Sequence, residues 1–305
     1  MQITPEQVAT PIHKAIVVGA GIAGLCAAHQ LLECGIAVTV IDSADQPGGN
    51  CRYASPDTYV ADAGDEIPNA SLSDAVRWRT TESAILTEDL ISTNTTRSPM
   101  ITNFLRYFGL DITDASQLHA HHLLKIRNMP PTALSGPYMV RTLCSAVQTR
   151  KGFSLRLKCT MTGFLMTDLH VVGVECEANN GTERLYGPVV FATRGFGCDR
   201  DLVAQYCPAF TDLPTSNILG PLRHTPLITI GAKMVEMNKV QLYPIGYHDQ
   251  LFPKSWQKSL IPETLLQDGA LLLHGGTTII NGLGTRAEIA KDIMSHPKSL
   301  KNRAI

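Results

Sequence analysis

The sequence predicts an α/β fold, with a parallel sheet flanked by helices and a β-hairpin layer added to it. The first observation is that two apolar runs, Ala15–Val18 and Ala37–Ile41, flank the helix-forming stretch Leu25–Leu32. This is the order of a βαβ unit. The second observation is a series of short strand-like runs between residues 154 and 193, which includes Asn180-Gly181. That dipeptide is typical of a hairpin turn.

The predicted βαβ unit contains a glycine-rich turn, Gly19 to Gly24, between its first strand and its helix. Gly19 permits a tight turn, Gly21 allows close approach of a pyrophosphate, and Gly24 allows the helix to pack on the strand. Asp42 ends the second strand and is able to accept hydrogen bonds from ribose hydroxyls. We expect the ADP part of a dinucleotide to bind to Gly19, Ala20, Gly21, Ala23, Gly24 and Asp42. A glycine-rich turn without a ligand is the alternative.

Two further glycine turns follow predicted strands. Gly48-Gly49 lies in a loop after the second strand, where backbone amides bind phosphate or ring oxygens, although a plain Pro-Gly turn has the same composition. Thr193-Arg194-Gly195 follows the apolar run Val189–Thr193. In α/β sheets, ligands bind at the carboxyl ends of the strands. Both turns are therefore candidates for the same site.

The other elements follow from apolar periodicity and from helix-ending residues such as Gly109. The predicted helices are Asp74–Leu86, Met100–Phe108, Gly136–Gln148, Asp201–Tyr206 and Ala287–Ser295. The predicted strands of the second half are Ser154–Lys158, Val171–Glu177, Arg184–Tyr186 and Val189–Thr193.

Composition excludes several classes of partner. The chain has 305 residues, a net charge of −1 and 44% hydrophobic residues, which suits one large or two ordinary domains. We expect no nucleic-acid partner, no membrane span and no secretory signal. Eight scattered cysteines indicate a reducing compartment, either the cytoplasm or an organelle lumen. No metal is expected, because His119, His121 and His122 lack accompanying ligands at suitable spacing.

Taken together, these segments resemble the soluble FAD-dependent fumarate reductases, and are most similar to the NADH-dependent modules of yeasts and trypanosomatids. The resemblance extends along the whole chain, in the order that the family has. The matching stretches are VVGAGIAGLCAAHQL, PGGNCRYAS, VVGVE, VVFATRGFG, QYCPAFTDLPTSN, GAKMVEMNKVQLYPIGY and LIPETLLQDGALLLHGGTTIINGLGTR.

The resemblance implies that FAD lies on the dinucleotide fold and that reduced flavin passes a hydride to fumarate, giving succinate. An NADH-linked domain or protein is the implied electron donor. Gly49 and Asn50 fall on the family's GGN loop along the cofactor, and Thr193 and Gly195 fall on its ATGGFG turn. The implied domains are an FAD-binding domain over residues 1–240 and the beginning of a cap domain over 241–305.

The same resemblance places the catalytic residues in the cap segment. Arg286, in GTR, matches the arginine that delivers a proton to the substrate carbon, and Glu263, in IPET, matches the relay glutamate. From the residues alone, Arg286 is only an arginine that starts a helix, and Glu263 a glutamate in a first helical turn. The family continues beyond the point that matches Ile305, so a truncated relative is expected.

The substrate site departs from the family pattern more than the cofactor site does. The departures are Tyr243 for a substrate histidine, Pro262 for a threonine, Leu265-Leu266-Gln267 for LRG, Asn281-Gly282 for NE, Ala287 for an aspartate, Ser55-Pro56-Asp57 for SSG, Gly220 to Arg223 for TGDG, and Arg194 for a glycine. A degenerate FAD-binding relative that lacks half of the substrate site is therefore the alternative function. An NAD(P)-binding protein is disfavoured by the GGN loop.

Overall fold

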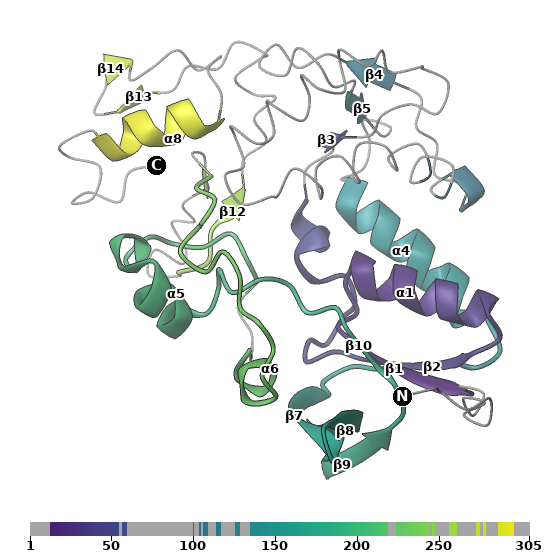
Figure 1. The fold of residues 1–305 in the computed structure, drawn as a ribbon. Helices are drawn as coiled ribbons and strands as arrows, with labels where there is room; N and C mark the ends of the chain where they lie inside the picture. Colours follow the sequence, from purple (N-terminus) through teal and green to yellow (C-terminus); the bar gives the residue numbers. More distant parts are fainter. Residues whose placement is uncertain are drawn as a thin grey trace, which may run out of the picture. The chain divides into compact units, whose positions relative to one another are not determined.

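Figure 1 shows the helices and strands of the computed structural model, whose chain divides into two compact units. The first contains Met1–Gly49, Leu143–Arg194 and Gly220–Lys233, and the second contains Asn50–Thr142, Gly195–Leu219 and Met234–Ile305. The structure describes residues 13–54, 57–59, 100, 104, 106–108, 114–116, 126–128, 135–218, 224–243, 246–247, 256–260, 273–274, 277–278 and 286–295.

A parallel sheet of four strands forms the centre of the first unit, in the order β10-β1-β2-β6. The strands are β1 (Lys14–Val18), β2 (Ala37–Ile41), β6 (Phe153–Arg156) and β10 (Val189–Phe191). Val18 pairs with Ile41 on one side and with Phe191 on the other. The carboxyl ends of β10, β1 and β2 therefore meet at one edge of the sheet.

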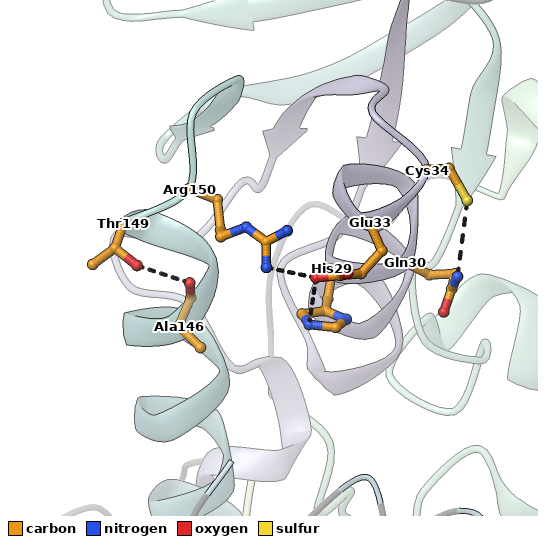
Figure 2. A network of polar contacts seen from close by, with 7 residues as sticks. All are labelled: His29, Gln30, Glu33, Cys34, Ala146, Thr149 and Arg150. Carbon is orange, nitrogen blue, oxygen red and sulfur yellow. Dashed lines mark hydrogen bonds and ion pairs between the residues drawn. The ribbon is translucent and has the colours of Figure 1, made fainter. Parts of the chain in front are cut away.

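Helix α1 (Ile22–Glu33) connects β1 to β2 and packs on the sheet through Leu25, Ala28 and Leu32, which are buried. Cys34 is its C-cap, and the next residue, Gly35, has a φ of 74°, a left-handed conformation that glycine adopts at low cost. The C-terminal part of α4 (Ser135–Gln148) belongs to the same unit, with Leu143 and Val147 fully buried. Arg150, just after α4, forms an ion pair with Glu33 of α1 (Figure 2).

A three-stranded antiparallel sheet, in the order β7-β8-β9, packs against the parallel sheet. Its strands are β7 (Thr160–Thr167), β8 (His170–Ala178) and β9 (Gly181–Tyr186). One buried cluster joins residues of both sheets and contains Ile16, Val18, Ile41, Cys159, Met161, Val174 and Cys176. The predicted hairpin layer is therefore confirmed, but its turn is Asn179-Asn180, one position before the predicted Asn180-Gly181, because Ala178 pairs with Gly181.

The second unit is built from short elements. Its helices include the 3₁₀ helices η1 (Gly49–Tyr53, which begins at the unit boundary) and η2 (Pro208–Phe210), and the α-helices α5 (Arg200–Tyr206) and α8 (Arg286–Ser295). One sheet consists of β3 (Asp57–Tyr59), β5 (Ile126–Asn128) and β4 (Asp114–Ser116). Two further strand pairs are β11 (Gly246–Tyr247) with β12 (Ser259–Leu260), and β13 (Leu273–His274) with β14 (Thr277–Thr278). Asp199 caps α5, because its Oδ1 accepts from Leu202 N at 3.1 Å.

Most predicted elements are confirmed with small shifts of their ends. The differences include β7 and the short strands of the second unit, which the sequence pattern does not predict, and β10, which ends at Phe191 rather than at Thr193. The predicted helix Asp74–Leu86 lies outside the described residues, and Met100–Phe108 is helical at Met100, Phe104, Arg106 and Tyr107. Among the described helices, none has the length and apolar character needed to cross a membrane. The domain boundary at residue 240 stays a prediction.

Candidate functional site

The glycine turn between β1 and α1 is closely packed at both ends. Gly19 has a φ of 107°, and a Cβ added there would lie 2.6 Å from the carbonyl oxygen of Ala192, directly after β10. A Cβ added at Gly24 would lie 1.8 Å from the carbonyl oxygen of Gly19. Both distances are far shorter than van der Waals contact, so this conformation of the turn requires glycine at both positions.

The N-terminus of α1 is open to an anion. Gly21 is the N-cap residue, no side chain caps the helix, and its first turn contains no acidic residue. Ala23 is exposed, and Gly21 and Ile22 are half-buried. Uncapped N–H groups and the positive end of the helix dipole favour a phosphate at this point. The geometry fits the pyrophosphate expected from the sequence.

Asp42 holds the glycine turn in place. Its Oδ2 accepts a hydrogen bond from Ala20 N at 2.6 Å, and its Oδ1 accepts one from Ala44 N at 2.8 Å. The carboxylate thus joins the end of β2 to the glycine turn, a role that the sequence reasoning missed. Each carboxylate oxygen retains further acceptor capacity. Recognition of a ribose by Asp42 is compatible with this geometry and stays a prediction.

The turn formed by Gly48 and Gly49 lies against the glycine turn. Gly48 N donates to Ala20 O at 2.8 Å, and Gly48 forms a parallel bridge with Gly21. Both glycines have positive φ values, 121° and 52°. A Cβ added at Gly49 would lie 3.6 Å from the Cα of Gly21. The placement beside the N-terminus of α1 supports a cofactor loop over a plain surface turn.

The turn after β10 reaches the same edge of the sheet. The backbone nitrogen of Thr193 lies 3.3 Å from the position of a Cβ on Gly19. Arg194 follows, and its carbonyl oxygen lies 3.3 Å from Nε2 of His224, which is buried. Nδ1 of His224 has no hydrogen-bond partner in the described part of the chain. Sequence reasoning did not single out His224, since an isolated histidine carries no motif.

The remaining predicted site residues belong to the second unit. Gly195 is exposed, and the side-chain amide of Asn50 is bonded to Asn217 and Ile218. Arg286 is the first residue of α8, and Glu263 lies outside the described residues. The catalytic assignments of Arg286 and Glu263 therefore stay predictions.

Metal binding finds no support at the described positions. Nowhere in the described ranges do three His, Cys, Asp or Glu side chains come together as a metal site would require. The histidines at 119, 121 and 122 lie outside those ranges.

A parallel sheet with a glycine turn, an uncapped helix N-terminus and an acid at the end of the next strand defines a dinucleotide-binding α/β protein. The FAD binding domain family matches residues 14–304, and the chain belongs to this family. FAD is the cofactor, and the glycine turn, the α1 N-terminus and the Gly48-Gly49 turn fit it.

Known fumarate reductases are similar along almost the whole chain, which confirms the resemblance seen in the sequence. Fumarate reductase of Schizosaccharomyces pombe is 28% identical, over 92% of this chain and 59% of its own length. Fumarate reductase 1 of Saccharomyces cerevisiae is 25% identical, over 95% of this chain and 65% of its own length. A flavocytochrome c3 fumarate reductase in its open conformation shares the fold, with a TM-score of 0.72 and 23% identity over 97% of this chain and 55% of its own.

The chain thus spans about three fifths of the length of the curated relatives that it matches.

Proposed function

We propose that this chain is an FAD-dependent oxidoreductase that reduces fumarate to succinate. The observation that carries the proposal is an uncapped α1 N-terminus beside the Gly48-Gly49 turn. This site lies in a chain that matches a fumarate reductase over 92% of its residues. An NADH-linked domain or protein is the proposed electron donor, and fumarate and succinate are the proposed ligands.

Each residue of the cofactor site has a distinct task. The first-turn N–H groups of α1 bind the pyrophosphate, and Asp42 holds the backbone of Ala20 and Ala44 in place. When bound, FAD supplies the hydride chemistry. The backbone of Gly48 and Gly49 lies close enough to Gly21 to border the cofactor.

We assign proton delivery at the substrate carbon to Arg286, with Glu263 as the group that returns the proton to it. An arginine has a very high pKa, so this role requires a relay and a site from which water is excluded. A dicarboxylate such as fumarate is bound best by charge-assisted hydrogen bonds from cationic side chains. Arg286, at the start of α8, is suited to both tasks.

A second candidate function is FAD binding without fumarate turnover. Tyr243 stands where the family resemblance places a histidine that binds a substrate carboxylate. Leu265, Leu266 and Gln267 stand where it places a relay arginine. These substitutions remove cationic or proton-carrying groups from the substrate site and leave the glycine turns unchanged.

An anaerobic reoxidation assay separates the two functions. The FAD-loaded chain is photoreduced and mixed with fumarate, while flavin absorbance and succinate are followed. We expect fumarate-dependent reoxidation, reduced by about a hundredfold or more in Arg286→Ala, the range that general acids contribute. Arg184→Ala is the matched control, because Arg184 is exposed and paired with Glu175 on β8.

Two outcomes would correct the proposal. Reduced flavin that reacts with oxygen but not with fumarate would support the second candidate function. Undiminished turnover in Arg286→Ala would overturn the assignment of the proton donor. FAD affinity is measured in parallel and is expected to be unchanged in Arg286→Ala.

A further inference from the structure

A chain of polar side chains lies next to the cofactor loop in sequence and within the second unit in the structure. It begins at Asn50, the residue directly after Gly49, and continues through Asn217 and Thr215. Thr215 is buried, whereas Asn50 and Asn217 are half-buried. None of the sequence patterns singled out Asn217 or Thr215 as functional.

The side-chain amide of Asn50 uses both of its polar atoms within the protein. Its Nδ2 donates to Oδ1 of Asn217 at 2.5 Å, and its Oδ1 accepts from the backbone nitrogen of Ile218 at 2.9 Å. These two bonds fix residues 217 and 218 to Asn50. Both polar atoms of the amide therefore have partners within the protein, and the NH₂ group keeps a second N–H.

The network continues from Asn217 to the glycine turn after β10. Nδ2 of Asn217 donates to Oγ1 of Thr215 at 3.1 Å, and that hydroxyl donates to the carbonyl oxygen of Gly197 at 3.0 Å. A Cβ added at Gly197 would lie 2.9 Å from Nδ2 of Asn217, so glycine is required for this close approach. One chain of hydrogen bonds thus joins Asn50 to the end of the ATRGFG turn.

Backbone bonds fix Thr215 on its other side. Thr215 N donates to Trp256 O at 3.0 Å, and Lys258 N donates to Thr215 O at 2.8 Å. Nε1 of Trp256 donates to the carbonyl oxygen of Leu213 at 2.7 Å. Thr215 is therefore bonded to two other segments of the second unit, at Gly197 and at Trp256 and Lys258, and provides a fixed point for Asn217 and Asn50.

We propose that Asn50, Asn217 and Thr215 are positioning residues for FAD, and we call them the Asn50 network. Gly48 and Gly49 both have positive φ and belong to the most flexible residue type. Fixing Asn50 directly behind them restricts the turn before the cofactor arrives, which lowers the conformational entropy lost on binding.

This inference goes beyond the proposed function. It rests on FAD as the cofactor, and fumarate as the substrate has no part in it. Dissociation constants for FAD are measured without substrate. A lack of fumarate turnover would therefore contradict the proposed function and leave this inference intact.

The test compares two substitutions at one position. Asn217→Leu removes every polar atom of the side chain at similar size, whereas Asn217→Asp keeps an acceptor for Nδ2 of Asn50. FAD dissociation constants, the absorption spectrum of bound flavin, its midpoint potential and the unfolding temperature of the FAD-free chain are measured for each. Asn238→Leu, at an exposed turn position, is the matched control.

We expect Asn217→Leu to weaken FAD binding by about tenfold or more, the effect of losing one to two net hydrogen bonds. Its bound-flavin spectrum and midpoint potential shift as well, which a loss of general stability would not produce. Asn217→Asp stays within about threefold of the unmodified chain, since the bond from Asn50 is retained. The double variant Asn50→Ala, Asn217→Leu is expected to lose less FAD affinity than the two single variants summed, because both remove the Asn50–Asn217 hydrogen bond.

Equal FAD affinity and an unchanged flavin spectrum in Asn217→Leu would overturn the inference. So would a loss of affinity that follows only the unfolding temperature, with the spectrum and the potential unchanged. Thr215→Val removes the hydroxyl that bonds to Asn217 and Gly197 and keeps the shape of the side chain. This variant replaces Asn217→Leu in the test if Asn217→Leu does not fold. Its FAD affinity is expected to fall by about threefold or more, and an unchanged value would also overturn the inference.

Discussion

Among the described glycines, Gly24 has the least space for a side chain. The 1.8 Å between an added Cβ and the Gly19 carbonyl oxygen cannot be relieved by a side-chain rotation, since both groups belong to the backbone of the turn and its helix. We predict that Gly24→Ala opens the turn and weakens FAD binding by about a hundredfold or more, because the α1 N–H groups lose their alignment.

Fluorescence titration with FAD, together with thermal unfolding, measures the effect of Gly24→Ala. Gly163→Ala is the control, because a Cβ at Gly163 meets nothing within 4 Å. Unchanged FAD affinity in Gly24→Ala would show that the cofactor binds elsewhere.

Asp42 acts on the same turn through its two backbone contacts. An asparagine in its place would keep one acceptor oxygen and direct an NH₂ group at the second backbone N–H. We predict that Asp42→Asn weakens FAD binding by about tenfold and lowers the free energy of unfolding by about 1–3 kcal/mol. Asp45→Asn, at an exposed position of the same loop, is the control for the loss of one negative charge. If both variants have the same FAD affinity and the same free energy of unfolding, the two hydrogen bonds of Asp42 have no role in FAD binding or stability.

Cys159 lies in the buried cluster between the two sheets. Burial, together with the hydrogen bond and charge of Cys176, raises the pKa of the Cys159 thiol from 9.0 to about 12. The unfolded chain releases this proton near pH 9 and the folded chain does not. The thiol therefore stabilises the fold fully below pH 9, and that contribution is lost as pH rises toward about 12.

We predict that deprotonation of Cys159 lowers the free energy of unfolding by up to about 1.4 kcal/mol per pH unit over this alkaline range. Urea unfolding at a series of pH values measures it, and Cys159→Ala is expected to flatten the slope. An identical slope in the variant would assign the alkaline loss of stability to other groups.

At the scale of elements, a polar contact joins α1 to the end of α4 (Figure 2). Nη1 of Arg150 lies 2.5 Å from Oε1 of Glu33, and the two side chains are 38% and 42% exposed. Nε2 of His29 lies 3.6 Å from the same Oε1. We predict that Arg150→Ala lowers the free energy of unfolding by less than about 1 kcal/mol, since solvent and salt screen an exposed pair. Urea unfolding at low and high salt checks this, and a loss that persists in high salt would contradict it.

The elements that the sequence predicts best are those whose local signals agree. Around α1, the apolar strands, the glycine turn and the helix formers all specify one βαβ unit, and the structure confirms it. Strand β7 escapes prediction because its register shifts between Met161 and Gly163 and between Leu165 and Met166. These irregularities break the alternation by which a strand is recognised.

The same contrast holds for the site. The glycines were predictable because a strand-to-helix turn beside a pyrophosphate needs them within a few residues. Asn217 was not, because its partner Asn50 is 167 positions away. Such a contact is created by the tertiary fold and leaves no local pattern. The hydrogen bond from Ala20 N to Asp42 was not predicted for a similar reason, since Ala20 lies 22 positions before Asp42.

At the scale of the whole molecule, the glycine turns of the cofactor site and the residues proposed for proton transfer belong to different units of the chain. The α1 N-terminus, Asp42 and the Gly48-Gly49 turn all belong to the first unit. Arg286 and Glu263, which we assign to proton transfer, belong to the second. We therefore expect FAD affinity to respond to Gly24, Asp42 and Asn217, and fumarate turnover to respond to Arg286 in addition.

The most direct test of the account is a titration of the purified chain with FAD, followed by visible absorption and by quenching of flavin fluorescence. The account predicts saturable uptake of about one FAD per chain, with a resolved flavin absorption band that is lost in Gly24→Ala. A colourless chain that takes up no added FAD would contradict the assignment of the β1–α1 turn as the cofactor site.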